Sequence, residues 1–209
     1  MTSVTLILEL QSYWQIGSGD GLGAIADSAA LRDANGLPYI PGRQIKGILR
    51  QAFREAHIFQ AYADCAETEL ESLLFGTGNQ TDDRFATLPG LLHISNAVLA
   101  ADEQAALLAQ PGYISHLFQM VYSTAIDNYG VAKDGSLRGS EVAIPMRLSA
   151  HIGWEVTSVE PAYRARQQQL MSAYPLATLI APLAGLVAGV GAKRNRGFGE
   201  VICSMEGAH

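Results

Sequence analysis

Hydrophobic and polar residues alternate over residues 3–11 (SVTLILELQ), and this pattern predicts a half-buried β-strand. After Pro41-Gly42 the spacing changes to that of a helix over residues 43–59, where apolar side chains gather on one side. The same reasoning predicts strands over 91–99, over 142–156 with an edge or hairpin at Pro145, and at the end of the chain, and helices over 66–75, 102–110 and within 167–192.

Helices and strands therefore alternate along the chain and are few in number. Such a pattern favours an α+β fold, a ferredoxin-like sandwich with insertions, over a long parallel sheet. The length of 209 residues is typical of a single domain. A glycine-rich stretch from Gly17 to about Pro41 is long for a loop without regular structure, and loops of that kind usually carry function.

Composition narrows the class of protein. Hydrophobic residues make up 48% of the chain, enough for a sizeable core, and no charged residue occurs between Gln167 and Ala192. Pro175 and Pro182 interrupt that apolar region, which predicts a buried helix pair or a broken core helix and no membrane partner. Two distant cysteines without a CxxC pair, and an N-terminus typical of a strand and not of a signal peptide, favour a cytoplasmic protein.

The net charge is −6, yet half of the basic residues fall in two short segments. In the helix after Pro41, the cations occupy an arc of about 80° opposite the apolar side, and Glu55 is the acid nearest to them. We call these four cations, Arg43, Lys46, Arg50 and Arg54, the α-ridge. The second segment is a loop bounded by glycines, whose backbone N–H groups can bind phosphate oxygens. Two interpretations remain open, solvated faces or contacts to a phosphate backbone, for Arg43, Lys46, Arg50 and Arg54 in the first segment and Lys193, Arg194 and Arg196 in the second.

Two aspartates stand in the segment GAIADSAALRD, residues 23–33, without a nearby histidine or cysteine. Asp33 precedes Ala-Asn-Gly, which is a turn signal. Asp27 either caps a turn with its own carboxylate or takes part in chemistry whose other groups are not in this segment. Familiar motifs do not fit: the GxGxxA at 19–24 lacks the following helix of a dinucleotide site, and GxxxxGK[ST] is absent.

Several segments, in the same order, resemble the RAMP superfamily, the repeat-associated proteins of CRISPR effector complexes. GLPYIPGRQIKGILR is similar to the family's segment around Pro-Gly and a following lysine, although Arg43 and Gln44 replace the usual small pair. LLHISNAVL resembles a family strand, with Asn96 where aspartate is frequent. STAIDNYGVAKDGSLRGSEVAIP (123–145) resembles the family's projecting hairpin, which is called the thumb. GAKRNRGFGEV (191–201) resembles the family's C-terminal glycine-rich loop.

The resemblance is closest to the backbone subunit that repeats along the guide RNA in type III effectors. It implies an RRM-derived palm with a glycine-rich nuclease-type loop at 17–41, a helical insertion at about 57–90, a thumb at about 123–146 and the C-terminal loop at 191–199. The implied partners are crRNA, target RNA, copies of the chain and other Cas subunits. The implied RNA-binding residues are Arg43, Lys46, Arg50, Lys193, Arg194, Arg196 and Gly197, with Ile126 and Val131 at the thumb.

In active members of that group an aspartate in the loop after the first strand cleaves target RNA with a divalent metal, and Asp27 occupies this position. Ala26 and Ala29 depart from the family pattern beside it. A single carboxylate suffices if RNA and water supply the other ligands of Mg²⁺, or if it deprotonates a 2′-OH. Three hypotheses follow: a target-cleaving subunit active only when assembled, an inactive structural subunit, and a guide-processing endoribonuclease.

Overall fold

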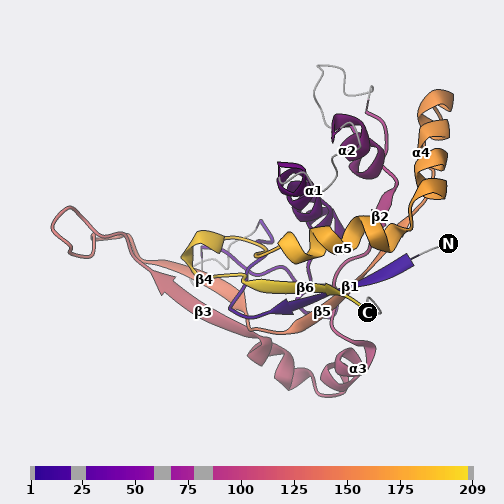
Figure 1. Ribbon diagram of the computed structural model, residues 1–209. Helices are drawn as coiled ribbons and strands as arrows, with labels where there is room; N and C mark the ends of the chain where they lie inside the picture. The colour runs from indigo at the N-terminus through magenta and orange to yellow at the C-terminus, as the bar shows by residue number, and fades with distance from the viewer. Residues whose placement is uncertain (1–2, 20–26, 59–66, 78–86, 207–209) are drawn as a thin grey trace.

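The computed structural model describes residues 3–19, 27–58, 67–77 and 87–206. Its central sheet is antiparallel with strand order β2-β5-β1-β6, and the strands are β1 (Ser3–Leu10), β2 (Leu92–Ile94), β5 (Arg147–Trp154) and β6 (Val201–Met205). Helices α1 (Gly42–Ile58) and α5 (Leu176–Leu186) cover one face of this sheet (Figure 1). The βαββαβ path and the order of its strands confirm the α+β, ferredoxin-like class that the sequence predicts.

The alternation in β1 sets which face of the sheet is the core. Leu6, Leu8 and Leu10 are buried beneath the helices, whereas Thr5 and Glu9 lie on the other face. Antiparallel pairing places Leu6 opposite Ala150 and Leu8 opposite Leu148, so that apolar side chains of β1 and β5 share one layer. From α1, the predicted apolar side chains complete that layer: Ile45, Leu49, Ala52, Phe53 and Ala56 are all buried.

The start of α1 explains why a glycine follows Pro41. A Cβ on Gly42 would lie 2.0 Å from the carbonyl oxygen of Ile94, so no larger residue fits without displacing the β2 backbone. The Gly42 N–H donates to the Asn96 side-chain oxygen at 3.0 Å. Asparagine and aspartate offer the same kind of acceptor to a helix N-terminus, so Asn96 preserves this contact.

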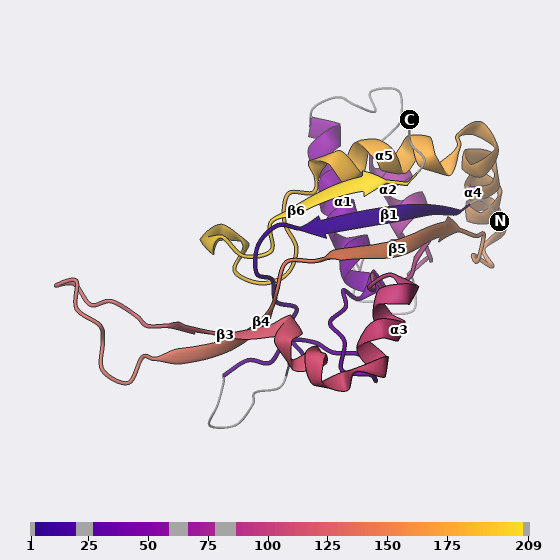
Figure 2. The same cartoon turned by 90° about the horizontal axis from the view of Figure 1, so that it is seen from below.

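A separate two-stranded sheet forms a hairpin that projects from the molecule, seen at the left of Figure 1 and again in Figure 2. Its strands are β3 (Phe118–Ser123) and β4 (Arg138–Ala143), so the hairpin begins five residues before the predicted 123. The predicted strand over 142–156 is therefore wrong in one respect: it is two strands in different sheets. Pro145 lies between them, where the lack of an N–H suits the break in pairing.

The insertions differ from the expectations in extent. The strand predicted over 91–99 is only three residues long, because the chain leaves the sheet at Ser95 and makes single bridges from Ala97 to Ile40 and from Val98 to Ser149. Helix α3 (Ala101–Ala109) and the 3₁₀ segment η1 (Pro111–Leu117) then lead into the hairpin. Helix α2 (Glu67–Phe75) belongs to the predicted insertion at 57–90, of which 59–66 and 78–86 lie outside the described residues.

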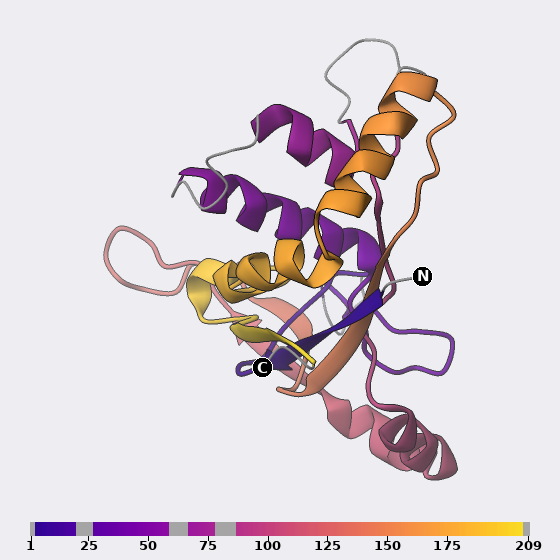
Figure 3. The same ribbon diagram turned by 45° about the vertical axis from the view of Figure 1, so that its right-hand side comes forward.

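The long apolar region forms two helices with different surroundings. Helix α5 is a core helix, but α4 (Pro161–Ala173) buries only Gln167 and Leu170, so the predicted buried pair is half wrong. The two helices meet at 85°, and Figure 3 shows the orange α4 rising steeply from α5. No single described helix is long and apolar enough to cross a membrane. The bent pair of α4 and α5 has the length and apolar composition for it only when the two helices are taken together.

Candidate nucleic-acid interface

Asp27 lies at the base of the hairpin, beside the first residues of β4. Its backbone N–H donates to the carbonyl oxygen of Gly139 at 2.9 Å, and its carboxylate Oδ2 accepts the N–H of Gly139 at 3.0 Å. The residue is exposed, and within the described ranges nothing donates to the second oxygen, Oδ1. Asp27 therefore has one carboxylate oxygen bound to the hairpin, while Oδ1 has no donor among the described residues. Residues 20–26 of the glycine-rich loop lie outside the described residues.

The segment after Asp27 runs along β4 as an additional short strand. Ser28 pairs in parallel with Ser140, and its carbonyl oxygen accepts the N–H of Glu141 at 2.9 Å. The Ser28 hydroxyl also accepts from the side-chain amide of Gln15, at 2.8 Å. Asp27 is thus held between the chain that leaves β1 and the base of the hairpin.

Asp33 has a different role from Asp27. Its Oδ1 accepts the N–H groups of Asn35 at 2.9 Å and of Leu37 at 2.8 Å, and its backbone pairs with Leu37 as well. This arrangement is an Asx turn closed within five residues. The prediction that Asp33 is a turn residue is confirmed.

The glycine-rich loop at 191–199 also contacts the hairpin base. The Lys193 ammonium donates a hydrogen bond to the buried Ser140 hydroxyl at 2.8 Å, and the Ala192 N–H donates to the Gln15 carbonyl oxygen at 2.9 Å. Lys193 has φ 58°, the one left-handed non-glycine backbone among the described residues. Asp27 and Lys193 therefore contact adjacent residues of β4, although the sequence separates them widely.

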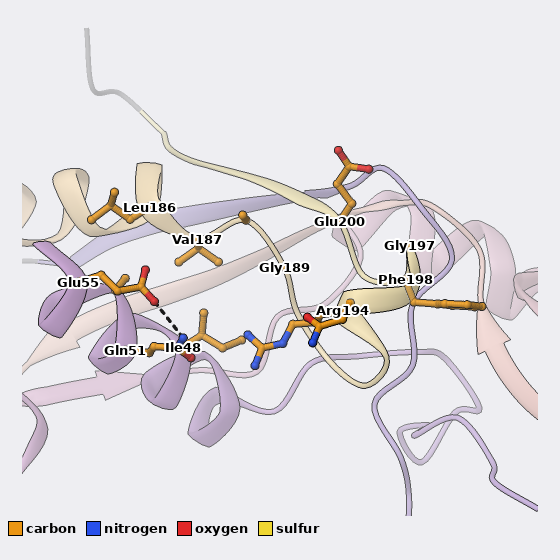
Figure 4. Close-up of a pocket in the computed structure, with 13 residues that line it drawn as sticks. Ile48, Gln51, Glu55, Leu186, Val187, Gly189, Arg194, Gly197, Phe198 and Glu200 are labelled. Carbon is orange, nitrogen blue, oxygen red and sulfur yellow. Dashed lines mark hydrogen bonds between the residues drawn. The ribbon is translucent and has the colours of Figure 1, made fainter.

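Arg194 and Arg196 follow in a single 3₁₀ turn (η2, Arg194–Arg196) that leaves both side chains exposed. Neither forms an ion pair with any residue in the described parts of the chain. Figure 4 shows the Arg194 side chain in a groove of about 480 Å³ that lies between the loop, α1 and the end of α5. Its walls include Ile48 and Val187, and on α1 the Gln51 amide donates to the Glu55 carboxylate at 3.0 Å.

The α-ridge is not a free row of cations, and this corrects the expectation drawn from the helix alone. Glu71 of α2 accepts hydrogen bonds from both Arg50 and Arg54, with an Arg54 Nη2 to Glu71 Oε1 distance of 2.7 Å. The hydrogen bond from Arg54, and then that from Arg50, lower the pKa of Glu71 despite burial, which raises it. The acid beside the ridge is thus Glu71 from another helix, and not Glu55, which faces the groove.

Lys46 and Arg43 complete the α-ridge. Lys46 is half-buried, and its ammonium donates a hydrogen bond to the Leu92 carbonyl oxygen at 2.9 Å. Burial, with a smaller effect of the neighbouring Arg50 charge, lowers the pKa of Lys46. Arg43 is exposed at the start of α1. The ridge lies against α2 and β2, whereas Arg194 lies on the opposite flank of α1, so the two cationic segments do not form one patch.

The site offers little protein ligation for a metal. No group of three or more histidine, cysteine, aspartate or glutamate side chains comes together in the described parts of the chain. Asp27 presents one carboxylate oxygen at an exposed position. This donor set fits an ion such as Mg²⁺, which retains several waters and is often held by one carboxylate together with phosphate oxygens.

Comparison with known proteins places the chain in a family. The sequence model of the RAMP superfamily matches residues 7–202, nearly the whole chain. The protein belongs to the RAMP superfamily. This RAMP chain also resembles solved structures: one chain from the "Type III-B Cmr-beta bound to cognate target RNA" superimposes with a TM-score of 0.62 at 12% identity, covering 98% of this chain and 97% of that one.

A second structure, the "Type III-B Cmr-beta Cryo-EM structure of the Apo state", gives a TM-score of 0.56 at 13% identity, with coverage of 99% and 98%. A search of curated proteins finds no match. At these identities the structural likeness establishes the shared fold of the RAMP chain.

The contacts that unite the site were not visible in the sequence. Gln15, Ser140 and Glu71 were absent from the predicted set because each acts through a partner in another segment of the chain. Ser140 and Glu141 lie within the stretch that resembles the family's hairpin segment, which was their only signal.

Proposed function

We propose that this RAMP protein is a crRNA-binding backbone subunit of a type III CRISPR effector complex, with target RNA, further copies of itself and other Cas subunits as partners. The observation that carries the proposal is the meeting of three elements at the hairpin base. Gly139 and Ser140 belong to the projecting hairpin, Asp27 hydrogen-bonds to Gly139, and Lys193 of the glycine-rich loop donates to Ser140. The similarity in fold to a chain of a target-bound type III-B complex supports it.

RNA phosphates are the proposed ligands of the glycine-rich loop. Arg194 and Arg196 are exposed, and guanidinium groups bind phosphate oxygens in pairs. Gly197 has φ 78° and nothing within 4 Å of a Cβ position, so a phosphate can approach its backbone closely. Lys193 and Arg43 add positive charge, while Lys46 and Arg50 retain their predicted RNA-binding role with part of their donor capacity already used inside the protein.

The hairpin, which we call the thumb, is the proposed contact to bases. Ile126 is 68% exposed and Val131 is 61% exposed, near Tyr129 at 90%. Exposed apolar side chains on a projecting hairpin are suited to insertion between stacked bases. The thumb would thereby separate successive segments of a guide–target duplex.

Asp27 is the proposed catalytic residue for cleavage of the target RNA. Its oxygen Oδ1, which has no donor among the described residues, can hold a divalent ion, with Mg²⁺ as the expected one, or accept the proton of a 2′-OH. A bound Mg²⁺ would supply Lewis-acid stabilisation of the charge that develops on the phosphate. The other oxygen, Oδ2, stays hydrogen-bonded to Gly139, which fixes the direction of the carboxylate.

The same hydrogen bond favours a second candidate function. A carboxylate that accepts a backbone N–H at the hairpin base has a structural use without any chemistry. In that case the chain is an inactive structural subunit of the same kind of complex. The two functions differ in one measurable property, which is the need for a negative charge at position 27.

The test replaces the charge and keeps the hydrogen bond. Asp27→Asn retains an acceptor for Gly139, and we expect the assembled complex with crRNA and Mg²⁺ to bind target RNA unchanged while losing its cuts, by about 100-fold or more. Asp33→Asn is the matched control, because its amide oxygen can still accept from Asn35 and Leu37. Cutting by Asp27→Asn at the wild-type rate would show that the subunit's aspartate is structural.

A further inference from the structure

One arginine links the Asp27 segment to both strands of the thumb. The guanidinium carbon of Arg32 lies 3.5 Å from the centre of the Phe118 ring, in β3. Its Nη2 is 2.7 Å from Oε1 of Glu141, in β4. Arg32 therefore stacks on one strand and forms an ion pair with the other, while its backbone belongs to the segment that begins at Asp27.

Glu141 is the centre of this arrangement, and both of its carboxylate oxygens are used. Oε1 accepts from Arg32, and Oε2 accepts the backbone N–H of Ala30 at 3.2 Å. The Glu141 side chain is only 11% exposed, so it needs these donors to balance its buried charge. The backbone of Glu141 also donates to Ser28. A single thumb residue thus holds the segment at positions 28, 30 and 32.

The planar guanidinium suits this place better than an ammonium group would. Stacking on an aromatic ring and an in-plane hydrogen bond to a carboxylate use the face and the edge of the same group. A lysine keeps the charge but cannot do both with the same orientation. The geometry therefore depends on the identity of Arg32 and not merely on its sign.

We propose that Arg32 is a positioning residue, which holds the Asp27 segment on the thumb so that the carboxylate keeps a fixed place relative to the RNA that the thumb engages. This inference rests on the proposed nuclease function. Asp27 then keeps a constant position relative to the thumb. A target phosphate whose position is set by the thumb therefore lies at a constant distance from the carboxylate. Loosening the link should reduce the cleavage rate and blur the position of the cuts, because small displacements of reacting groups are costly.

The experiment uses the assembled complex with crRNA, target RNA and Mg²⁺. Arg32→Lys keeps the charge beside Glu141, and Phe118→Leu keeps an apolar residue but removes the ring. For both variants we expect the cleavage rate at saturating target to fall about 10-fold, target affinity to change by less than about twofold, and cuts to spread to neighbouring phosphates. Arg164→Lys is the matched control, because Arg164 is exposed on α4, away from the thumb.

Two results would overturn the proposal: wild-type rates and cut positions in both variants, or a loss of affinity as large as the loss of rate. A wild-type complex that never cuts would contradict the nuclease function and not the link itself. Amide hydrogen exchange then decides. Arg32→Lys should accelerate exchange of the Ala30 and Gly139 N–H groups about 10-fold, while the β1–β5 ladder is unchanged, and unchanged exchange at both groups would refute the link.

Discussion

At the residue scale, two glycines of the C-terminal loop share a left-handed backbone but differ in the space around them. Gly199 has φ +68°, and a Cβ there would lie 1.9 Å from the Val190 carbonyl oxygen; Gly197 has φ +78° and nothing within 4 Å. Gly197→Ala should lower the free energy of unfolding by about 1 kcal/mol, because a left-handed backbone is unfavourable for a residue with a Cβ. Gly199→Ala should cost roughly 3 kcal/mol or more, because the loop has to move. Denaturant unfolding of the two variants measures the difference, and equal losses would mean that the close contact is not rigid.

The two aspartates of residues 23–33 show which residue-scale features a sequence reveals. Asp33 bonds to N–H groups two and four positions ahead, so its turn follows from the local letters. The partner of Asp27 is 112 positions away, and nothing in GAIADSAALRD indicates it. The proposal of a catalytic role for Asp27 came from a family resemblance, and its neighbours Gly139 and Ser140 came only from the fold.

At the element scale, one carboxylate adds an ionic contact between α1 and α2 to the apolar contact of Phe53 with Phe75. The Arg54 and Arg50 hydrogen bonds depress the pKa of Glu71, so they stabilise the fold above the unfolded-state pKa and are lost as pH falls through the lower folded value. Glu71→Gln should therefore reduce the free energy of unfolding by about 1 to 2 kcal/mol at pH 7, and the gap from wild type should close below about pH 4. Denaturant unfolding between pH 7 and pH 3 checks both expectations.

Glu69 provides the matched control on the same helix. Its ion pair with Arg166 joins side chains that are 46% and 61% exposed, where solvent screens the attraction. Glu69→Gln should change the free energy of unfolding by about 0.5 kcal/mol or less at every pH. A loss equal to that of Glu71→Gln would show that α2 needs negative charge in general and not the Arg50–Glu71–Arg54 contact.

Periodicity predicted the faces of α1 correctly but not what lies against them. The apolar side is the core, as its spacing indicates, because burial acts on the local pattern of a helix. The cations were predicted to meet solvent or phosphate, yet α2 brings Glu71 to two of them. An insertion that folds back on the helix leaves no mark in the helix's own sequence.

At the scale of the whole molecule, the order of elements was enough to predict the ferredoxin-like sheet, since a βαββαβ path has few ways to bury both helices on one face. The same order could not show that the segment from Asp27, the thumb and the C-terminal loop converge. That convergence follows from the strand directions: β1 ends where β5 and β6 begin, since Glu9 pairs with Arg147 and Leu10 with Val201. The connections at this end of the sheet lead toward the hairpin base, as Figure 2 shows. The site is thus a product of topology, assembled from segments that are each weak signals alone.

The whole molecule carries a net charge of −6 and is still proposed to bind RNA. If Arg194 and Arg196 each hold a phosphate of single-stranded guide RNA, replacing both by alanine should reduce the slope of log affinity against log salt by about 1.4. The same change of net charge at Arg164 and Arg166 of α4 should leave the slope unaltered. Fluorescence anisotropy with a guide-length RNA at several salt concentrations measures both. Equal changes in the two double variants would mean that RNA senses only the overall charge, whereas a selective change places the phosphate path along the glycine-rich loop.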